Sequence, residues 1–272
     1  MRTLKLTLQY IGTHYCGWQI QPNGVTVQEI VQNILNKTLG EDIKVIGAGR
    51  TDSGVHALGQ VAHFKTVNPM DGPTLHKALN AQLPDDIAVS ALEEKPEDFH
   101  ANKNAKAKTY TYLFLNSRQK QPFLTPYTWR QYGDYHLEAS RQCLKLIQGT
   151  HDFRSFCAAD STAKTTERTL VKAQWTTFSL AQLGQKLAGL AEISEWLPKP
   201  EGALGEADIH AVSFQGEGFL KHMVRNIIGT LRDVAFGKIS PQDFKNILEF
   251  RDRTQAGVTA PPQGLFLINV DY

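Results

Sequence analysis

The stretch GAGRTDSGVHALG, residues 47–59, lies between two segments in which apolar and polar side chains alternate. We read residues 43–48 and 60–66 as strands on its two sides. Its glycines allow the backbone to approach a ligand closely and to adopt dihedral angles that other residues avoid. The sequence therefore predicts a loop between two strands, with Arg50 and Asp52 near its centre.

The elements around this loop follow the order β-α-β-β-α-β. A strand ends near Tyr10, and apolar residues at helical spacing predict a helix over residues 27–39 that stops at Gly40. A second helix is predicted over 74–83, ahead of a strand over 87–92. This is the order of the split βαβ unit, which is typical of many RNA-binding proteins but does not by itself fix a function.

The rest of the chain repeats this pattern loosely. We predict strands over residues 108–116, 170–178, 209–215 and 264–270, and helices over 137–147, 220–235 and 241–250. The predicted fold class is therefore α+β, with two related βαββαβ-like halves of the ferredoxin type and mainly antiparallel sheets. We expect one domain over residues 1–104, which carries the Asp52 loop. A second domain over 105–272 would contain Tyr110, Arg225 and an inserted amphipathic helix near 179–205.

The overall composition is that of an ordinary globular protein: 41% of the 272 residues are hydrophobic, 21% are charged, and the net charge is +2. No apolar run comes near the roughly 20 residues that cross a bilayer, and the opening residues do not resemble a signal peptide. Cys16, Cys143 and Cys157 are far apart, which predicts neither a disulfide framework nor a zinc site. We therefore expect a cytoplasmic protein without a membrane segment.

Charge is distributed unevenly along the chain. Residues 99–133 contain six Lys or Arg, no Asp or Glu, and eight aromatic residues. A basic and aromatic segment in a nearly neutral protein is typical of a nucleic-acid interface. The alternative is that the aromatic side chains belong to the core of a strand and that the lysines form its solvated face.

Several kinds of site contain an Asp in a glycine-rich loop. A phosphate-binding loop is disfavoured, because the third glycine of GxGxxG and a Gly-Lys-Ser/Thr sequence are both missing. An aspartic protease needs two carboxylates that share a proton, and the single Asp52-Ser53-Gly54 would supply two only in a homodimer. Ser53 has no paired His and Asp in the order of a serine hydrolase. Asp52 can also simply cap a turn.

Longer motifs in the chain resemble those of the TruA family, the tRNA pseudouridine synthases A. The sequence GRTDSGVHALGQVAHF at residues 49–64 is similar to the signature of that family. Further motifs occur in the family's order along the chain: Tyr10-x-Gly12-x-x-Tyr15-x-Gly17-Trp18-Gln19, Asn80-x-x-Leu83-Pro84, Phe99-His100-Ala101, Tyr110-x-Tyr112, His222-Met223-Val224-Arg225-Asn226-Ile227, Thr259-Ala260-Pro261 and Gly264-Leu265.

The resemblance implies a pseudouridine synthase fold and isomerisation of uridine to pseudouridine at positions 38, 39 and 40 in the anticodon stem-loop of tRNA. It implies that Asp52 is the catalytic nucleophile, that Tyr110 stacks on the target uracil and that Arg225 pairs with the Asp52 carboxylate. Leu265 would supply an apolar wall, and Arg50 would help to hold the strand from which the base is extruded. The resemblance also implies a homodimer that needs no metal or cofactor.

Three residues depart from the family pattern. Ile11, Asn102 and Lys108 stand where the family usually has Asp, Arg and Arg. Arg presents a fork of donors that Lys and Asn do not reproduce, so these departures affect the expected phosphate contacts rather than the catalysis. The alternative function is a non-catalytic RNA-binding protein on the same platform. Asp52 argues against it, because a carboxylate in a basic cleft repels phosphate.

Overall fold

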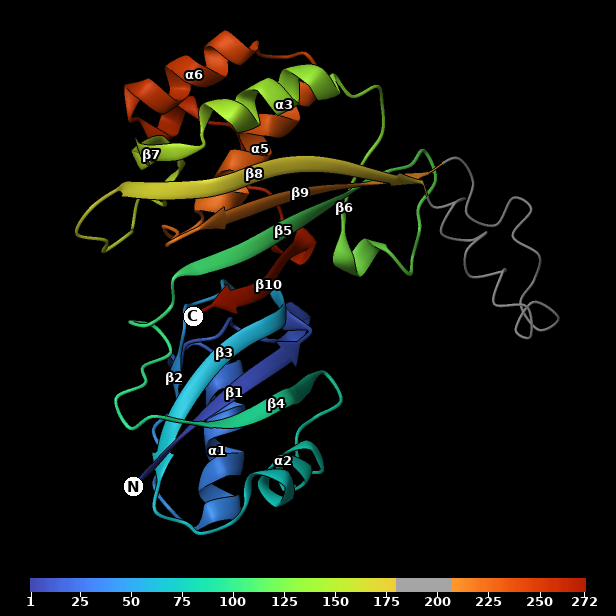
Figure 1. Ribbon diagram of the computed structural model, residues 1–272. Coiled ribbons are helices and arrows are strands. Elements are labelled where there is room, and N and C mark those ends of the chain that lie inside the picture. The colour runs from blue at the N-terminus through green and yellow to red at the C-terminus, as the bar shows by residue number, and fades with distance from the viewer. Residues whose placement is uncertain (180–206) are drawn as a thin grey trace, which may run out of the picture. The chain divides into compact units, whose positions relative to one another are not determined.

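The computed structural model describes residues 1–179 and 207–272 (Figure 1). The chain forms two compact units. The first consists of Met1–Tyr110, Gln215–Gly218 and Phe266–Tyr272, and the second of Thr111–Phe214 and Phe219–Leu265.

The first unit is a sheet with two helices on one of its faces (Figure 1). Its strand order is β4-β1-β3-β10, and β2 also pairs with β3. β1 is antiparallel to β3 and β4, whereas β10 is parallel to β3. The elements are β1 (Arg2–Tyr10), η1 (Gly12–His14), α1 (Val27–Leu39), β2 (Ile46–Gly47), β3 (His56–Thr66), α2 (Gly72–Asn80), β4 (Ile87–Lys95) and β10 (Leu265–Asp271).

The pattern of apolar side chains explains both β1 and α1. α1 begins after Thr26, whose hydroxyl accepts a hydrogen bond from an amide of the first turn, and ends at Gly40 in the left-handed conformation. These bounds confirm the helix predicted over residues 27–39. Three alternating leucines of β1 are at most 1% exposed and form part of the core: Leu4, Leu6 and Leu8.

The strand predicted over residues 43–48 is wrong in its extent, since only β2 is formed. Side chains of α1 bind the backbone amides ahead of it. Asn36 Oδ1 accepts a hydrogen bond from Ile43 N at 2.8 Å. Gln32 Oε1 accepts one from Val45 N at 3.1 Å. These contacts replace the hydrogen bonds of a strand ladder, and the alternation of residues does not reveal them.

The second unit contains further strands of sheet, and its helices α3, α5 and α6 pack against one another beside these strands (Figure 1). The strand order is β5-β9-β8-β7, and β6 pairs with β5 in parallel. The elements are β5 (Ala107–Asn116), η2 (Thr125–Tyr127), β6 (Trp129–Gln131), α3 (Leu137–Leu146), β7 (Gly149–Asp152), η3 (Arg154–Phe156), β8 (Glu167–Ser179), β9 (Asp208–Gly216), α5 (Met223–Ala235), α6 (Pro241–Phe250), η4 (Arg253–Gln255) and η5 (Pro262–Gly264).

Two details of this part differ from the prediction. β6 and β7 were not predicted, because segments of three and four residues are too short to display an alternating pattern. The helix predicted over 220–235 begins only at Met223, because His222 ahead of it has a left-handed φ of 60°. The inserted helix predicted near 179–205 lies outside the described residues, except for Ser179, which ends β8.

The expected boundary after residue 104 differs from the division of the structure. The first unit continues to Tyr110, part of the way along β5, and also includes residues 266–272 near the C-terminus. Strands β5, β9 and β10 each contribute residues to both units. A division of this kind does not follow a single cut in the sequence.

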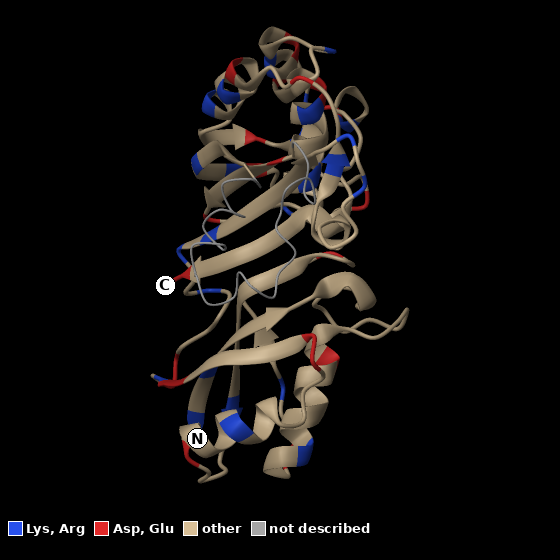
Figure 2. Cartoon of the chain, turned by 90° about the vertical axis from the view of Figure 1, so that its right-hand side faces the viewer, with Lys and Arg blue, Asp and Glu red and all other residues tan. Residues whose placement is uncertain are grey.

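The structure confirms the predicted α+β class with a mostly antiparallel sheet. Most strand positions are uncharged, and Lys, Arg, Asp and Glu lie mainly on helices and connecting segments (Figure 2). Within residues 1–179 and 207–272, none of the helices is long and apolar enough to cross a membrane.

Candidate active site

Asp52 lies on the loop between β2 and β3 of the first unit. Backbone groups of the loop that follows β1 hold this segment in place. Trp18 N donates to Thr51 O at 3.1 Å. Gly54 N donates to Tyr15 O at 3.3 Å. These hydrogen bonds fix the backbone on both sides of Asp52, whose side chain is half-buried.

Ser53, the neighbour of Asp52, has a structural contact. Its Oγ donates to Tyr15 O at 3.1 Å, so the hydroxyl joins the same two loops. Val55 N donates to Asp52 O at 3.1 Å and closes a tight turn, in which Gly54 has a φ of 77°. The turn presents the Asp52 side chain while its own backbone groups are hydrogen-bonded.

Gly17 makes the packing of the two loops possible. Its φ is 85°, and a Cβ at this position would lie 2.5 Å from Thr51 O and 3.1 Å from the carbonyl carbon of Asp52. A side chain here would meet backbone atoms, which can move only if the whole loop shifts. Glycine at this position therefore sets the location of the Asp52 backbone.

We expect Gly17→Ala to reduce turnover by about tenfold to a hundredfold, because a small displacement of a reacting group has effects of that size. Gly40→Ala is the matched control. Gly40 also has a positive φ, of 68°, but a Cβ there would meet nothing within 4 Å. Both variants should lose roughly 1–2 kcal/mol of unfolding free energy from the left-handed conformation. Thermal unfolding and steady-state kinetics separate the two effects, and equal turnover of the two variants would contradict this role of Gly17.

Tyr110 lies in the same unit as Asp52 and interacts with it. Its side chain is 7% exposed, and burial raises the pKa of its phenol, with further increases from Tyr10 and from the Asp52 charge. The hydroxyl oxygens of Tyr10 and Thr51 are 2.8 Å apart, and burial raises the pKa of Tyr10 to about 12. Both phenols are therefore protonated at neutral pH. Asp52 is accompanied by two buried aromatic rings.

Lys108 places a further cation beside the loop. It precedes Tyr110 by two residues on β5, and strand alternation puts both side chains on the same face. A Cβ at Gly49 would lie 3.1 Å from Lys108 Nζ, so the ammonium group rests against the loop backbone next to Arg50. Burial lowers the pKa of Lys108. Sequence analysis connects Lys108 only with phosphate contacts, whereas its two-residue spacing from Tyr110 is the signal for a position beside the Asp52 loop.

The backbone ahead of Arg50 is held by two side-chain amides. Asn102 Nδ2 donates to Ala48 O at 2.5 Å, so this departure from the family pattern makes a structural contact. Gln60 Nε2 donates to Gly49 O at 2.9 Å. Arg50 itself is exposed. An exposed guanidinium on a fixed backbone can contact a polyanion without any rearrangement of the loop.

The other two predicted site residues, Arg225 and Leu265, belong to the second unit. Arg225 Nε donates to Ala260 O at 2.8 Å, and Ala260 N donates back to Arg225 O at 3.1 Å. Tyr112 Oη donates to Pro261 O at 2.9 Å. Leu265 follows this segment at the start of β10 and is 5% exposed. The segment that leads to Leu265 is therefore tied to α5 and to β5.

Asn226, next to Arg225, connects α5 to two other segments. The Asn226 side chain is buried, with 1% of its surface exposed. Its Oδ1 accepts hydrogen bonds from Thr259 Oγ1 at 2.7 Å and from Arg253 at 3.1 Å. Its Nδ2 donates to Phe156 O at 2.8 Å. The motif around Arg225 thus holds the arginine on a helix that is fixed by buried hydrogen bonds.

The structure brings some of the predicted residues together and assigns the others to a separate unit. Asp52, Arg50 and Tyr110 belong to the first unit. The Asp52 charge is one of the causes that raise the pKa of the Tyr110 phenol. Arg225 and Leu265 share the second unit. The pairing of Arg225 with Asp52 and the apolar role of Leu265 stay predictions.

The described residues contain no group of three or more His, Cys, Asp or Glu side chains that could hold a metal ion. Cys16 is half-buried, whereas Cys143 and Cys157 are buried, and all three are free thiols. Burial raises the pKa of the Cys143 thiol to about 12, which leaves it unreactive at neutral pH.

Comparisons with known proteins give a consistent result. A sequence model of the tRNA pseudouridine synthase family matches residues 7–102 and 144–272. A protein of Thermoanaerobacter sp. named tRNA pseudouridine synthase A is 39% identical over 272 residues, which cover the whole of both chains. The protein of that name from Caldicellulosiruptor bescii is also 39% identical over the whole of both chains. The one from Citrifermentans bemidjiense is 41% identical over 273 residues, which cover 100% of this chain and 98% of its own.

The likeness to solved structures is weaker. The crystal structure of the archaeal box H/ACA sRNP Nop10-Cbf5 complex aligns with 83% of this chain, with a TM-score of 0.31 and 13% sequence identity. This chain spans 42% of the length of that chain. The assignment to a family therefore rests on the full-length relatives.

Proposed function

We propose that this chain acts at positions 38, 39 and 40 of the anticodon stem-loop of tRNA. The chain belongs to the tRNA pseudouridine synthase family and isomerises uridine to pseudouridine in tRNA. The observation that supports this most is the full-length similarity to proteins named tRNA pseudouridine synthase A. The TruA-type motifs, which run through the whole chain in the family's order, support the choice of positions.

The proposed reaction uses Asp52 as its nucleophile. The bond between uracil N1 and the sugar C1′ breaks, the uracil turns, and a bond forms between C5 and C1′. C5 loses its proton and N1 gains one, so the overall change is an isomerisation. The Asp52 carboxylate adds to the ring or to the sugar and leaves again, which holds the intermediate between the two bond changes. The fixed backbone around Asp52 supports this role, because it restricts the main chain from which the carboxylate projects.

Tyr110 is proposed to stack on the target uracil. The reacting atoms of a paired base are hidden inside the stem, so the nucleotide must turn out of the stack. An aromatic ring next to Asp52 offsets the lost stacking. The Asp52 charge contributes to the raised pKa of the Tyr110 phenol, after burial and Tyr10, and this proximity of ring and carboxylate supports the assignment.

Arg225, Leu265 and Arg50 are proposed as supporting residues. Arg225 would pair with the Asp52 carboxylate through its terminal nitrogens, since its Nε donates to Ala260 O. Leu265 would form an apolar wall beside the uracil. Arg50 would contact a phosphate of the strand from which the base leaves, in keeping with its exposure.

We further propose that the protein is a cytoplasmic homodimer that holds one tRNA across both subunits. Surfaces of two subunits along one RNA would raise the effective concentration at the second contact. Light scattering on the free protein tests the dimer directly. An active species with the mass of one subunit would contradict it.

The basic segment at residues 99–133 should contribute to tRNA binding. Lys103 and Lys106 are exposed, and their replacement by Glu should weaken tRNA binding and reduce its dependence on salt, because fewer counterions are released. Turnover at saturating tRNA should stay unchanged. Replacement of the exposed Lys145 and Lys172 by Glu gives the same change in net charge as a control. A salt dependence equal to that of the wild type would rule out this contact.

The positions are tested with three tRNA transcripts, each with one uridine at position 38, 39 or 40 and other bases at the remaining two. Chemical mapping after incubation should detect pseudouridine at the single uridine of each transcript. Pseudouridine formed only outside the anticodon stem-loop would overturn the assignment of positions.

A further inference from the structure

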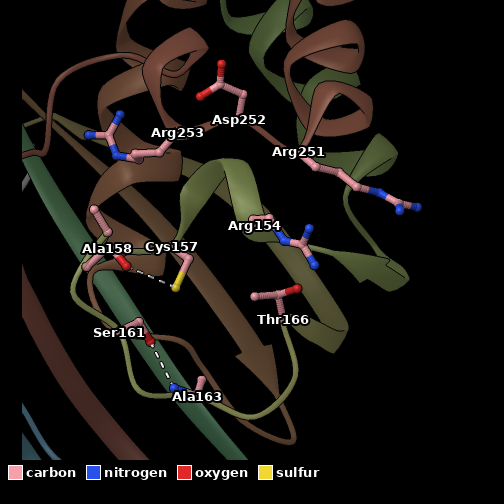
Figure 3. A pocket seen from close by; sticks show the side chains of 10 residues that line it. Arg154, Cys157, Ala158, Ser161, Ala163, Thr166, Arg251, Asp252 and Arg253 are labelled. Carbon is pink, nitrogen blue, oxygen red and sulfur yellow. Dashed lines mark hydrogen bonds between the residues drawn. The ribbon is translucent and has the colours of Figure 1, made fainter.

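The second unit has a pocket of about 310 Å³ that none of the predicted site residues lines (Figure 3). It lies between η3, the segment that follows η3, and the end of α6. Its walls carry three arginines and one acidic residue. The lining residues are Arg154, Cys157, Ala158, Ala159, Ser161, Ala163, Thr166, Arg251, Asp252 and Arg253.

Two of the arginines share a single carboxylate. A guanidinium nitrogen of Arg154 is 3.7 Å from Asp152 Oδ2, and one of Arg251 is 3.5 Å from the same oxygen. The Asp152 side chain is 14% exposed, whereas those of Arg154 and Arg251 are 60% and 61% exposed. Their guanidinium groups extend to the same side (Figure 3). Two positive charges thus reach solvent over one partly covered negative charge.

The third arginine, Arg253, adds positive charge to the wall of the pocket. It donates hydrogen bonds to the carbonyl oxygens of Ala256 and Gly257, to Asn226 Oδ1 and to Thr259 Oγ1, at 3.0 to 3.3 Å. All four acceptors are neutral. Arg253 is therefore held firmly in place while these partners leave its charge unbalanced.

Two acidic residues near the pocket have hydrogen-bond or ion-pair partners of their own. Asp252 accepts hydrogen bonds from Thr254 N at 2.9 Å and from Thr254 Oγ1 at 2.8 Å, which use both of its oxygens. Asp160, on the segment after η3, pairs with Lys221 at 2.6 Å. Three arginines and one acidic residue line the pocket, so the charge of its lining is positive on balance.

Arg251 also has an unusual backbone. Its φ is 56° at the end of α6, where glycine or asparagine is the common residue. His222 and Arg251 are the two non-glycine residues with positive φ in residues 1–179 and 207–272. A residue that keeps an unfavourable conformation points to a role for its side chain.

We propose that Arg154 and Arg251 bind a phosphate group of the tRNA backbone, as a contact of the second unit in addition to the Asp52 loop. Two guanidinium groups offer the fork of donors that suits a phosphate, and the hydroxyls of Ser161 and Thr166 line the same pocket. The segment after η3 is joined to the residues just ahead of α5, since Ala158 N donates to Lys221 O at 3.0 Å. The proposal rests on tRNA being the substrate.

The test is the double variant Arg154→Gln with Arg251→Asn, in which Asn tolerates the left-handed backbone. We expect the tRNA dissociation constant to rise by about tenfold. The slope of log affinity against log salt should fall by roughly 0.7 to 0.9, the value for one phosphate contact. Turnover at saturating tRNA should match the wild type. The melting temperature of Arg251→Asn alone should be equal or higher, which shows that the variant folds.

The matched control neutralises Lys238 and Lys245 with Gln. Each is exposed and lies beside one carboxylate of the same unit, so the control changes net charge by the same amount. Its tRNA affinity should change by less than about twofold. A double variant that binds like this control would overturn the proposal.

A second experiment distinguishes binding of an RNA phosphate in the pocket from binding of a free phosphate ion. Inorganic phosphate is titrated into wild type and double variant, and melting temperatures are compared. A shift that depends on the two arginines, together with unchanged tRNA affinity of the double variant, would assign the pocket to a small anion and overturn the RNA contact. If the wild type forms no pseudouridine at all, the proposed function is wrong, and this result is distinct from a failure of the phosphate contact.

Discussion

Asp52→Asn is expected to lower the rate of pseudouridine formation by about a thousandfold or more, as the loss of a nucleophile does in other enzymes. Asn has the shape of Asp but lacks the charge that forms the covalent bond. The affinity for tRNA should stay the same or improve slightly, because the loss of a negative charge near phosphate reduces repulsion. The rate is measured as release of tritium from uracil C5, since that position loses its hydrogen in the reaction.

The control for this variant is Asp85→Asn, which makes the same chemical change at an exposed acid of the first unit. It should keep the wild-type rate. Melting temperatures establish that both variants fold. Activity of Asp52→Asn above a few per cent of the wild type would refute the assignment of Asp52 as nucleophile.

Tyr110 should give the second large effect. Tyr110→Leu keeps an apolar side chain of similar bulk but removes the aromatic face, which contributes roughly 1–3 kcal/mol per stacked base. We expect the rate at low tRNA concentration to fall by the corresponding factor of about 5 to 150. Tyr110→Phe keeps the ring and should retain most of this rate, with any further loss attributable to the hydroxyl.

Tyr110→Ala is a less specific change, because removal of a buried ring also lowers the stability of the fold by about 3–5 kcal/mol. Leu and Phe variants therefore carry the test. Burial, Tyr10 and the Asp52 charge raise the pKa of the Tyr110 phenol, so it stays protonated through neutral pH and its ionisation adds no step to the pH profile there. If Tyr110→Leu reacts at the wild-type rate at low tRNA concentration, Tyr110 does not stack on the base.

Local patterns in the sequence predict those parts of the fold that depend on local interactions. α1 and α6 have the predicted bounds, because each combines apolar residues at helical spacing with a capping residue, Thr26 or Ser240. β2 was predicted too long, since Asn36 and Gln32 on α1 bind the amides that a strand would use. That competition comes from residues seven and thirteen positions away, and a pattern of neighbouring residues does not contain it.

In the candidate site, too, the sequence predicts the features that depend on neighbouring residues and misses those that depend on distant ones. The glycines around Asp52 predict a tight loop, and the structure provides the contact of Gly17 with the backbone of that loop. Lys108 could be predicted from its spacing to Tyr110, once both are placed on one strand. The arginine pocket could not, because Arg154 and Arg251 are far apart in the sequence and meet only at Asp152.

We propose that this chain forms pseudouridine in the anticodon stem-loop of tRNA through Asp52. The most direct measurement is a chemical map of every uridine in one unmodified tRNA transcript, after reaction with an excess of wild type or of Asp52→Asn. We predict pseudouridine at positions 38, 39 and 40 with the wild type and none with the variant. An anticodon stem-loop left unmodified by the wild type, or the same map with both proteins, would contradict the claim.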